Sequence, residues 1–196
     1  AAFNAAAQYP AKPVRILVGF APGGGTDIMA RAVGAKLAES LKQQFVVENR
    51  PGGGAVIATE AIARATPDGH TFGLLGSTLA TNPAVRNDLR YDTQRDLVGV
   101  TQLFNMQLAI VARPDAPFNT LKELIALAHA KPVLLYSSSG AGSGAHLNNE
   151  MFRYAAGIKA THVGFRSSSE AMIEVVASRV HFSVLPLGTG IAFIKD

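Results

Sequence analysis

One sequence pattern recurs along this chain of 196 residues: a short apolar run, then a loop rich in glycine or serine, then a segment with helical periodicity. The three clearest instances span residues 14–33, 45–65 and 133–152. Apolar strands that alternate with helices through short loops are typical of parallel β/α units. The sequence therefore predicts an α/β fold in which mostly parallel sheets are flanked by helices.

Further strands and helices are expected between and after these instances. A capping box, in which Thr120 is followed three residues later by Glu123, predicts a helix over 120–130. Thr26 or Asp27 is the expected cap of the first helix. The remaining expected strands are 71–75, one or two within 97–111, 161–165 and 180–185, and the remaining expected helices begin at 166–169 and after 188–190.

Composition excludes several classes of protein. The chain has no cysteine, which rules out a disulfide scaffold, a thiolate zinc site and a cysteine nucleophile. The net charge is +4, but the Lys and Arg residues are scattered singly, so we expect no nucleic-acid partner. No apolar stretch reaches the roughly 18 residues of a membrane span. The start, 1–8, is not an intact signal peptide, and we expect it to be the tail left after cleavage of one.

The loops themselves favour an anionic ligand. In a parallel sheet, the loops from strand to helix lie together at the carboxyl ends of the strands. Helix N-termini offer free N–H groups there, and glycines let an anion approach them closely. Three such loops, 21–27, 50–55 and 137–145, therefore predict a receptor for a small anion.

Known catalytic motifs are incomplete in these loops. Gly25 stands where a phosphate-binding P-loop has its lysine, and a dinucleotide fingerprint lacks its third glycine. Ser143 lacks the first glycine of a nucleophile elbow, because Ala141 stands there. The five histidines include no i, i+4 pair. We therefore predict no catalytic residue, no metal and no cofactor, and keep as the alternative an enzyme that uses the same loops on a small anionic substrate.

A set of short motifs occurs along the chain in a characteristic order. They are YPAKPVR at 9–15, FAPGGGTD at 20–27, ENRPG at 48–52, DGHT at 68–71, NP at 82–83, YD at 91–92, RD at 95–96 and SGAHL at 143–147. Together they resemble the Bug family, the solute-binding receptors of tripartite tricarboxylate transporters.

The resemblance implies a two-lobe periplasmic binding protein, similar to type II, with α/β lobes and a cleft between them. It implies a monomer that captures a small carboxylate, such as a dicarboxylate or an aromatic acid, and delivers it to a membrane permease. On this reading residues 1–104 form the first lobe and 105–196 the second.

Matching the motifs residue by residue gives the implied ligand site. From the first lobe it takes Phe20, Ala21, Gly24, Gly25, Thr26, Asp27, Ser77 and Thr78, and from the second Ser138, Ser139, Gly142, Ser143 and His146. Two positions depart from the family: Arg166 replaces a common lysine, and Leu185 replaces a common aspartate. The second change disfavours an amino-acid ligand, whereas Arg166 is a candidate partner for a second carboxylate.

Two further expectations concern the loops and the end of the chain. We expect Gly24 and Gly25 to adopt conformations, or approach the ligand at distances, that a residue with Cβ cannot. Family sequences continue well beyond the position that matches Asp196 and return to the first lobe. We therefore expect this chain to be a fragment of a longer receptor, with its first lobe incomplete.

Overall fold

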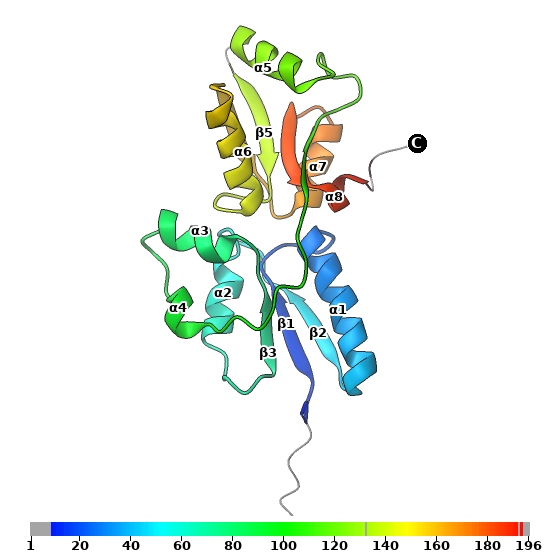
Figure 1. Ribbon diagram of the computed structural model, residues 1–196, viewed down its shortest axis with the longest axis vertical. Helices are drawn as coiled ribbons and strands as arrows, with labels where there is room; N and C mark the ends of the chain where they lie inside the picture. The colour runs from blue at the N-terminus through cyan, green and yellow to red at the C-terminus, as the bar shows by residue number, and fades with distance from the viewer. Residues whose placement is uncertain (1–8, 132, 192, 194–196) are drawn as a thin grey trace, which may run out of the picture.

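The computed structural model describes residues 9–131, 133–191 and 193, and it contains two separate sheets (Figure 1). The start at 1–8, which we interpreted as the remainder of a signal peptide, lies outside the described residues. Each sheet has its own helices, so the described chain forms an N-terminal and a C-terminal lobe. The predicted α/β class with mostly parallel sheets is confirmed.

The N-terminal lobe is a three-stranded parallel sheet in the order β2-β1-β3. Its central strand is apolar and buried, as a strand between two neighbours must be. Ile16 and Val18 pack there against Ala30 of the first helix. The strands are β1 (Val14–Val18), β2 (Phe45–Asn49) and β3 (Thr71–Leu74), and the helices are α1 (Gly25–Leu41), α2 (Val56–Ala63), α3 (Thr78–Val85) and α4 (Thr93–Asp96).

The C-terminal lobe is a four-stranded sheet in the order β4-β7-β5-β6, parallel except for the antiparallel pair β4 and β7. Successive side chains of a strand face opposite sides of a sheet. Accordingly Phe182 and Leu185 belong to two different apolar clusters. The strands are β4 (Leu108–Val111), β5 (Leu134–Ser138), β6 (Ala160–Gly164) and β7 (Phe182–Pro186), and the helices are α5 (Leu121–Ala130), α6 (Gly144–Ala155), α7 (Ser168–Val176) and α8 (Leu187–Ile191).

Asn149 is the polar centre of the C-terminal lobe. Its side chain is fully buried, and its Nδ2 donates to the carbonyl of Ala145, 2.8 Å away. Its Oδ1 accepts from the N–H of Val184 at 2.9 Å. A buried amide that is satisfied on both sides fixes helix α6 against strand β7 in one register.

One local expectation was wrong. The N-cap of α1 is Gly24, not Thr26 or Asp27, because the carboxylate of Asp27 instead bonds the loop that precedes the helix. Of the one or two strands expected within 97–111, one is present, β4 at the end of that range, while residues 97–107, all of which are described, form none. Val98 is 90% exposed there and has no neighbouring strand to pair with, so a β-favouring composition alone does not build one. This segment joins the two sheets, and the lobe boundary at 104/105 stays a prediction.

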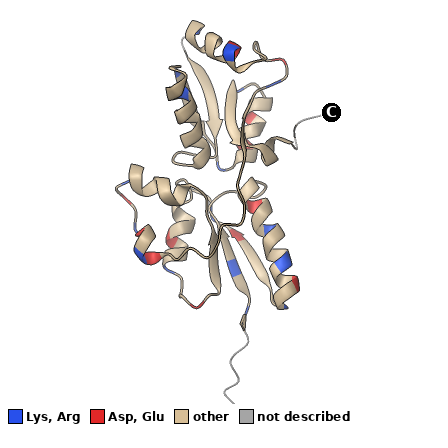
Figure 2. Cartoon of the chain, viewed as in Figure 1, with Lys and Arg blue, Asp and Glu red and all other residues tan. Residues whose placement is uncertain are grey.

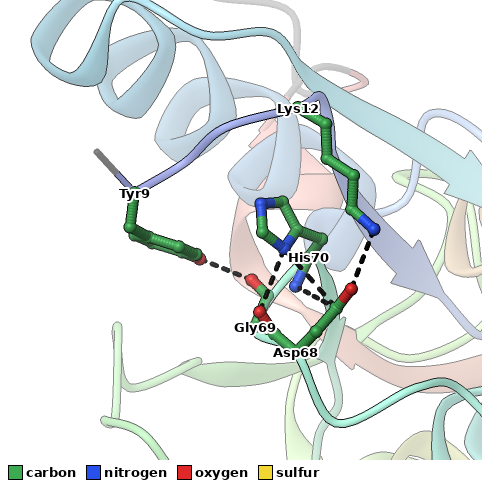
Figure 3. Close-up of polar contacts among 5 residues, drawn as sticks. All are labelled: Tyr9, Lys12, Asp68, Gly69 and His70. Atoms are coloured by element: carbon green, nitrogen blue, oxygen red, sulfur yellow. Dashed lines mark hydrogen bonds and ion pairs between the residues drawn. The ribbon is translucent and has the colours of Figure 1, made fainter. Parts of the chain in front are cut away.

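The N-terminal segment is fastened to the turn before β3 (Figure 3). The hydroxyl of Tyr9 donates to the carbonyl of Gly69, and Nζ of Lys12 lies 2.8 Å from Oδ2 of Asp68. The N–H of His70 donates to Oδ1 of Asp68 at 3.0 Å. The bond from Lys12 and that from the His70 N–H lower the pKa of Asp68 to about 2, so this carboxylate stays ionised in all but strong acid.

Charged residues of both signs are spread over the two lobes, as Figure 2 shows. None of the described helices combines the length and the hydropathy needed to cross a membrane.

Candidate functional site

The loops that follow the strands of the two lobes meet each other. The N–H of Ala21 donates to the carbonyl of Arg166 at 3.1 Å, and the hydroxyl of Ser169 donates to the carbonyl of Gly23 at 2.6 Å. Both bonds join the loop after β1 to the segment that runs from the end of β6 into the first turn of α7. The carboxyl ends of strands in the two sheets therefore face a common space, as expected for α/β units.

A second contact joins the loop after β2 to the loop after β5. Gly54 has φ +65°, and a Cβ built on it would stand 2.7 Å from the carbonyl oxygen of Ala141. No side chain fits at that distance. Gly144, at the start of α6, approaches the N-terminus of α3, because a Cβ there would collide with Oγ of Ser77, a side-chain atom that can rotate away. Glycine is therefore required at Gly54, where the obstacle is backbone, so that the lobes can touch.

A pocket of about 480 Å³ lies between these loops, a size typical of small-molecule sites. Both lobes contribute to its wall. Among the described residues that line it, the only charged ones are two arginines. The lining consists of Gly19, Phe20, Pro51, Gly52, Gly53, Gly54, Ala55 and Arg86 from the N-terminal lobe, and of Ser139, Gly140, Ala141, Phe165 and Arg166 from the C-terminal lobe.

A neighbouring hollow of about 510 Å³ shares part of this wall but is a shallower feature of the C-terminal lobe alone. It adds His162, Gly164 and Glu170 to four residues of the first pocket. We place the candidate site in the pocket between the lobes, because only that pocket is walled by the glycine-rich loops of both sheets.

Three of the residues implied by the family resemblance line this pocket: Phe20, Ser139 and Arg166. The role of the others as ligand contacts stays a prediction. The structure shows them shaping the loops around the pocket. They are Ala21, Gly24, Gly25, Thr26, Asp27, Ser77, Thr78, Ser138, Gly142, Ser143 and His146.

Asp27 organises the first glycine loop. Its buried carboxylate accepts from the N–H of Gly23 and from Nδ2 of Asn49, both at 2.9 Å, and it pairs with Arg31. Burial alone would raise the pKa of Asp27, but the hydrogen bonds from Arg31, Gly23 and Asn49 outweigh that effect and lower it. An ionised carboxylate at the start of α1 also suits the positive end of that helix.

Of the expectation for Gly24 and Gly25, the part that concerned their backbone conformation was wrong, while their close approach to the ligand stays a prediction. Gly24 has φ −78° and ψ 161°, an extended conformation that any residue adopts, and a Cβ there would make only ordinary contacts. At Gly25 a Cβ would stand 3.3 Å from the flexible end of Met106. The position that needs glycine is Gly23, with φ +83°.

The N-terminus of α3 carries buried hydroxyl and amide groups. Thr78 and Asn82 are buried, and Nδ2 of Asn82 donates to the carbonyl of Gly54 at 3.0 Å. Within the described residues, Oγ1 of Thr78 and Oδ1 of Asn82 have no partner. The amide of Asn82 thus holds the loop after β2 in place at the pocket wall.

Side chains of β5, β6 and α6 support the loop after β5 from behind. Oγ of Ser138 lies 2.6 Å from Nε2 of His162, and it accepts from the N–H of Gly140 at 3.1 Å. Nδ1 of His146 accepts from the N–H of Gly142 at 3.2 Å, while Ser143 caps α6. The two imidazole rings stack with their centroids 4.0 Å apart.

Both imidazoles are held neutral. Burial lowers the pKa of His146. Burial, reinforced by the neighbouring His146, lowers the pKa of His162 to about 4. Neutral rings can accept the hydrogen bonds that the loop donates, so this pair stiffens one wall of the pocket. No group of three or more histidine, aspartate or glutamate side chains in the ranges described is arranged to hold a metal ion.

Sequence reasoning missed Arg86 and assigned no role to the individual residues 51–55. The loop 50–55 was recognised as a glycine-rich turn, which is the signal that places it at the pocket. Nothing in the pattern around Arg86 points to the pocket, because that residue follows a helix that the sequence did not reveal.

Comparison with known proteins gives a consistent result. Residues 29–196 match the model of the tripartite tricarboxylate transporter family receptor. Protein BugT of Bordetella pertussis is 35% identical over 175 residues, which cover 88% of this chain and 54% of that protein. The chain thus spans about half the length of the curated relatives it matches.

Solved structures agree. A periplasmic transporter has a TM-score of 0.89 and 36% identity, over 94% of this chain and 62% of that one. The Rpa4515 protein of R. palustris, solved with adipate, has a TM-score of 0.88 and 31% identity, over 92% of this chain and 61% of that one. The family indicated by the sequence motifs is confirmed: this chain belongs to the receptor family of the tripartite tricarboxylate transporters.

Proposed function

We propose that this protein is a solute-binding receptor that captures a small carboxylate in the pocket between its lobes. The observation that carries the proposal is the pocket wall, which combines backbone-rich glycine loops with Arg86 and Arg166 and, among the described residues, includes no acidic one. Cationic groups in a recessed site concentrate anions. The likeness to Rpa4515 of R. palustris, solved with adipate, supports a carboxylate as the anion.

The remainder of the proposal follows from family membership. The receptor works outside the cytoplasm as a monomer and hands its ligand to the membrane permease of a tripartite tricarboxylate transporter. Support comes from the family description and from the likeness to a periplasmic transporter.

The alternative is an enzyme that acts on a small anion at the same loops. The one arrangement that resembles a nucleophile and its base is Ser138 with His162, at 2.6 Å. Ser138 is fully buried, however, and its oxygen is already engaged by the N–H of Gly140. The lowered pKa of His162, about 4, also makes it a weak base near neutral pH. This pair fits a supporting role in the loop better than catalysis.

Thermal melting of the protein against a panel of small carboxylates and nucleotides tests the proposal. A ligand that binds only the folded state stabilises it by about 2.7 kcal/mol at a hundred times its Kd. We expect carboxylates to raise the melting temperature and to be recovered unchanged after incubation. Stabilisation by nucleotides alone, or conversion of a carboxylate to a product, would overturn the receptor function.

A further inference from the structure

The two arginines of the pocket come from different lobes. Arg86 follows α3 in the N-terminal lobe, and Arg166 precedes α7 in the C-terminal lobe. A pocket to which each lobe contributes one cation offers two groups that can bind negative charge.

Arg86 is oriented before any ligand arrives. Its Nε and Nη2 donate to the two carboxylate oxygens of Asp88 at 2.9 and 2.7 Å. Its third nitrogen, Nη1, lies 3.5 Å from the carbonyl oxygen of Gly53, a residue of the pocket wall. A bidentate pair fixes the plane of a guanidinium, so the third nitrogen, Nη1, is held at the pocket wall.

Asp88 does not cancel the attraction of this site for anions. It is not among the residues that line the pocket, and 70% of its side chain is exposed. Water screens an exposed carboxylate strongly, whereas charges at a recessed wall are screened less.

Arg166 is positioned through its backbone, and its charge is available. Its N–H donates to Oε2 of Glu170 at 3.0 Å, and its carbonyl accepts from the N–H of Ala21. In the part of the chain that the structure describes, its guanidinium has no carboxylate within salt-bridge distance of 4.0 Å. A guanidinium without an ion-pair partner, at the mouth of a pocket, is suited to bind an anionic ligand group.

The rest of the pocket lining is mostly apolar side chains and glycines. Phe20 and Pro51 belong to the N-terminal lobe, and Phe165 and Ala141 to the C-terminal lobe. These groups favour hydrocarbon over a polar chain, since burial of apolar surface is the main gain available there. The middle of the ligand is therefore expected to be apolar.

We propose that Arg86 and Arg166 act together as specificity-determining residues that select a dicarboxylate with a short apolar spacer over a monocarboxylate of the same length. The inference rests on the proposed function, because both concern the same pocket. Each arginine holds one carboxylate, so a ligand with two carboxylates contacts both lobes.

Titration calorimetry on the full chain with adipate and hexanoate tests this. The two ligands have the same carbon chain and differ by one carboxylate. A hydrogen-bonded ion pair commonly changes affinity by about 10- to 100-fold, so the wild-type protein should prefer adipate by about that factor. In Arg86→Gln and in Arg166→Gln the preference should fall to less than about threefold. Arg166→Lys should keep part of it, because the charge remains.

Arg90→Gln is the matched control. Arg90 is an exposed arginine close in sequence to Arg86 but outside the pocket lining, and its loss should leave the preference for adipate unchanged. Circular dichroism melts of each variant verify folding, which is expected to persist because neither pocket arginine is buried.

The possible results separate this inference from the proposed function. If wild-type protein binds adipate and hexanoate with equal affinity, the two-arginine selection is wrong and carboxylate capture stands. The selection is also wrong if both glutamine variants keep the wild-type preference. If wild-type protein binds neither these two acids nor any other carboxylate of the panel, the proposed function itself fails.

Discussion

The imidazole of His162 makes the stability of the C-terminal lobe depend on pH. Its Nε2 lies 2.6 Å from Oγ of Ser138, and its ring stacks on His146 and on Tyr136, with centroid distances of 4.0 and 5.2 Å. Burial, followed by the charge of His146, lowers the pKa of His162 to about 4, against a weaker opposing effect of Glu150. Protonation would place a charge among these packed rings, in a site where burial disfavours it.

The sign and size of the effect follow from this pKa. The folded-state pKa of His162, about 4, lies below the value of 6.5 for an unperturbed imidazole. The unfolded chain therefore binds a proton in this range that the folded chain does not, and stability falls as the pH drops from about 6.5 to about 4. A fully buried group would lose about 3 kcal/mol. Because His162 is only half-buried, we expect about 1–2 kcal/mol.

Urea unfolding of wild type and of His162→Phe between about pH 7.5 and about pH 4.5 measures the effect. Phenylalanine keeps a ring to stack on Tyr136 but cannot titrate. The wild type should lose about 1–2 kcal/mol more than the variant over this range, since contributions from groups that do not contact His162 cancel in the difference. Ser138→Ala should lower stability at every pH yet keep the dependence. Equal losses in wild type and His162→Phe would refute the reasoning.

Four further outcomes are expected from single substitutions. Asn149→Ala should destabilise by about 3 kcal/mol in urea unfolding, because the buried N–H of Val184 loses its acceptor and the link between α6 and β7 is removed. Gly54→Ala should weaken adipate binding more than about tenfold in calorimetry, since its Cβ would meet the carbonyl of Ala141. Gly24→Ala, at an extended position, should stay within about threefold of wild type, and a larger loss would contradict the geometry. Thr120→Ala should cost about 1 kcal/mol by removing the capping box of α5, as thermal melting would show.

Sequence signals were sufficient to predict the structure where the interacting residues lie within one helix or strand. Strand β1 (Val14–Val18) opens the segment 14–33 that we interpreted as strand, loop and helix, because a short apolar run before a turn signal is typical of a buried strand. The capping box of Thr120 and Glu123 was predicted as it is observed. In both cases the residues whose interactions produce the structure lie within a few positions of one another in the sequence.

Helix α3 could not be predicted in this way. It contains Pro83, which has no N–H to donate to the carbonyl of Leu79 one turn earlier. The hydroxyl of Thr93 donates to that carbonyl instead, at 3.3 Å, from a separate segment of the chain. A proline within a short polar segment predicts a loop, and only the tertiary contact from Thr93 supplies the missing bond.

The same limit explains the pocket. The glycine-rich turns are visible in the sequence. Their convergence at one edge of each sheet could therefore be predicted from the parallel topology. Arg86 could not, because its place at the wall depends on α3 and on the pairing with Asp88. Its charge is visible in the sequence, but its neighbours are set by the fold.

The contacts between the lobes show why the choice of ligand is coupled to the association of the two lobes. The bonds from Ala21 to Arg166 and from Ser169 to Gly23 are neutral hydrogen bonds, each worth about 0.5–1.5 kcal/mol net. A ligand shifts an equilibrium between separated and joined lobes only if it binds the joined state better. A monocarboxylate held by one arginine gains little from the second lobe. A dicarboxylate that reaches both Arg86 and Arg166 gains its second ion pair only when the lobes are together. The free energy of this second ion pair therefore both distinguishes the dicarboxylate from the monocarboxylate and stabilises the joined lobes.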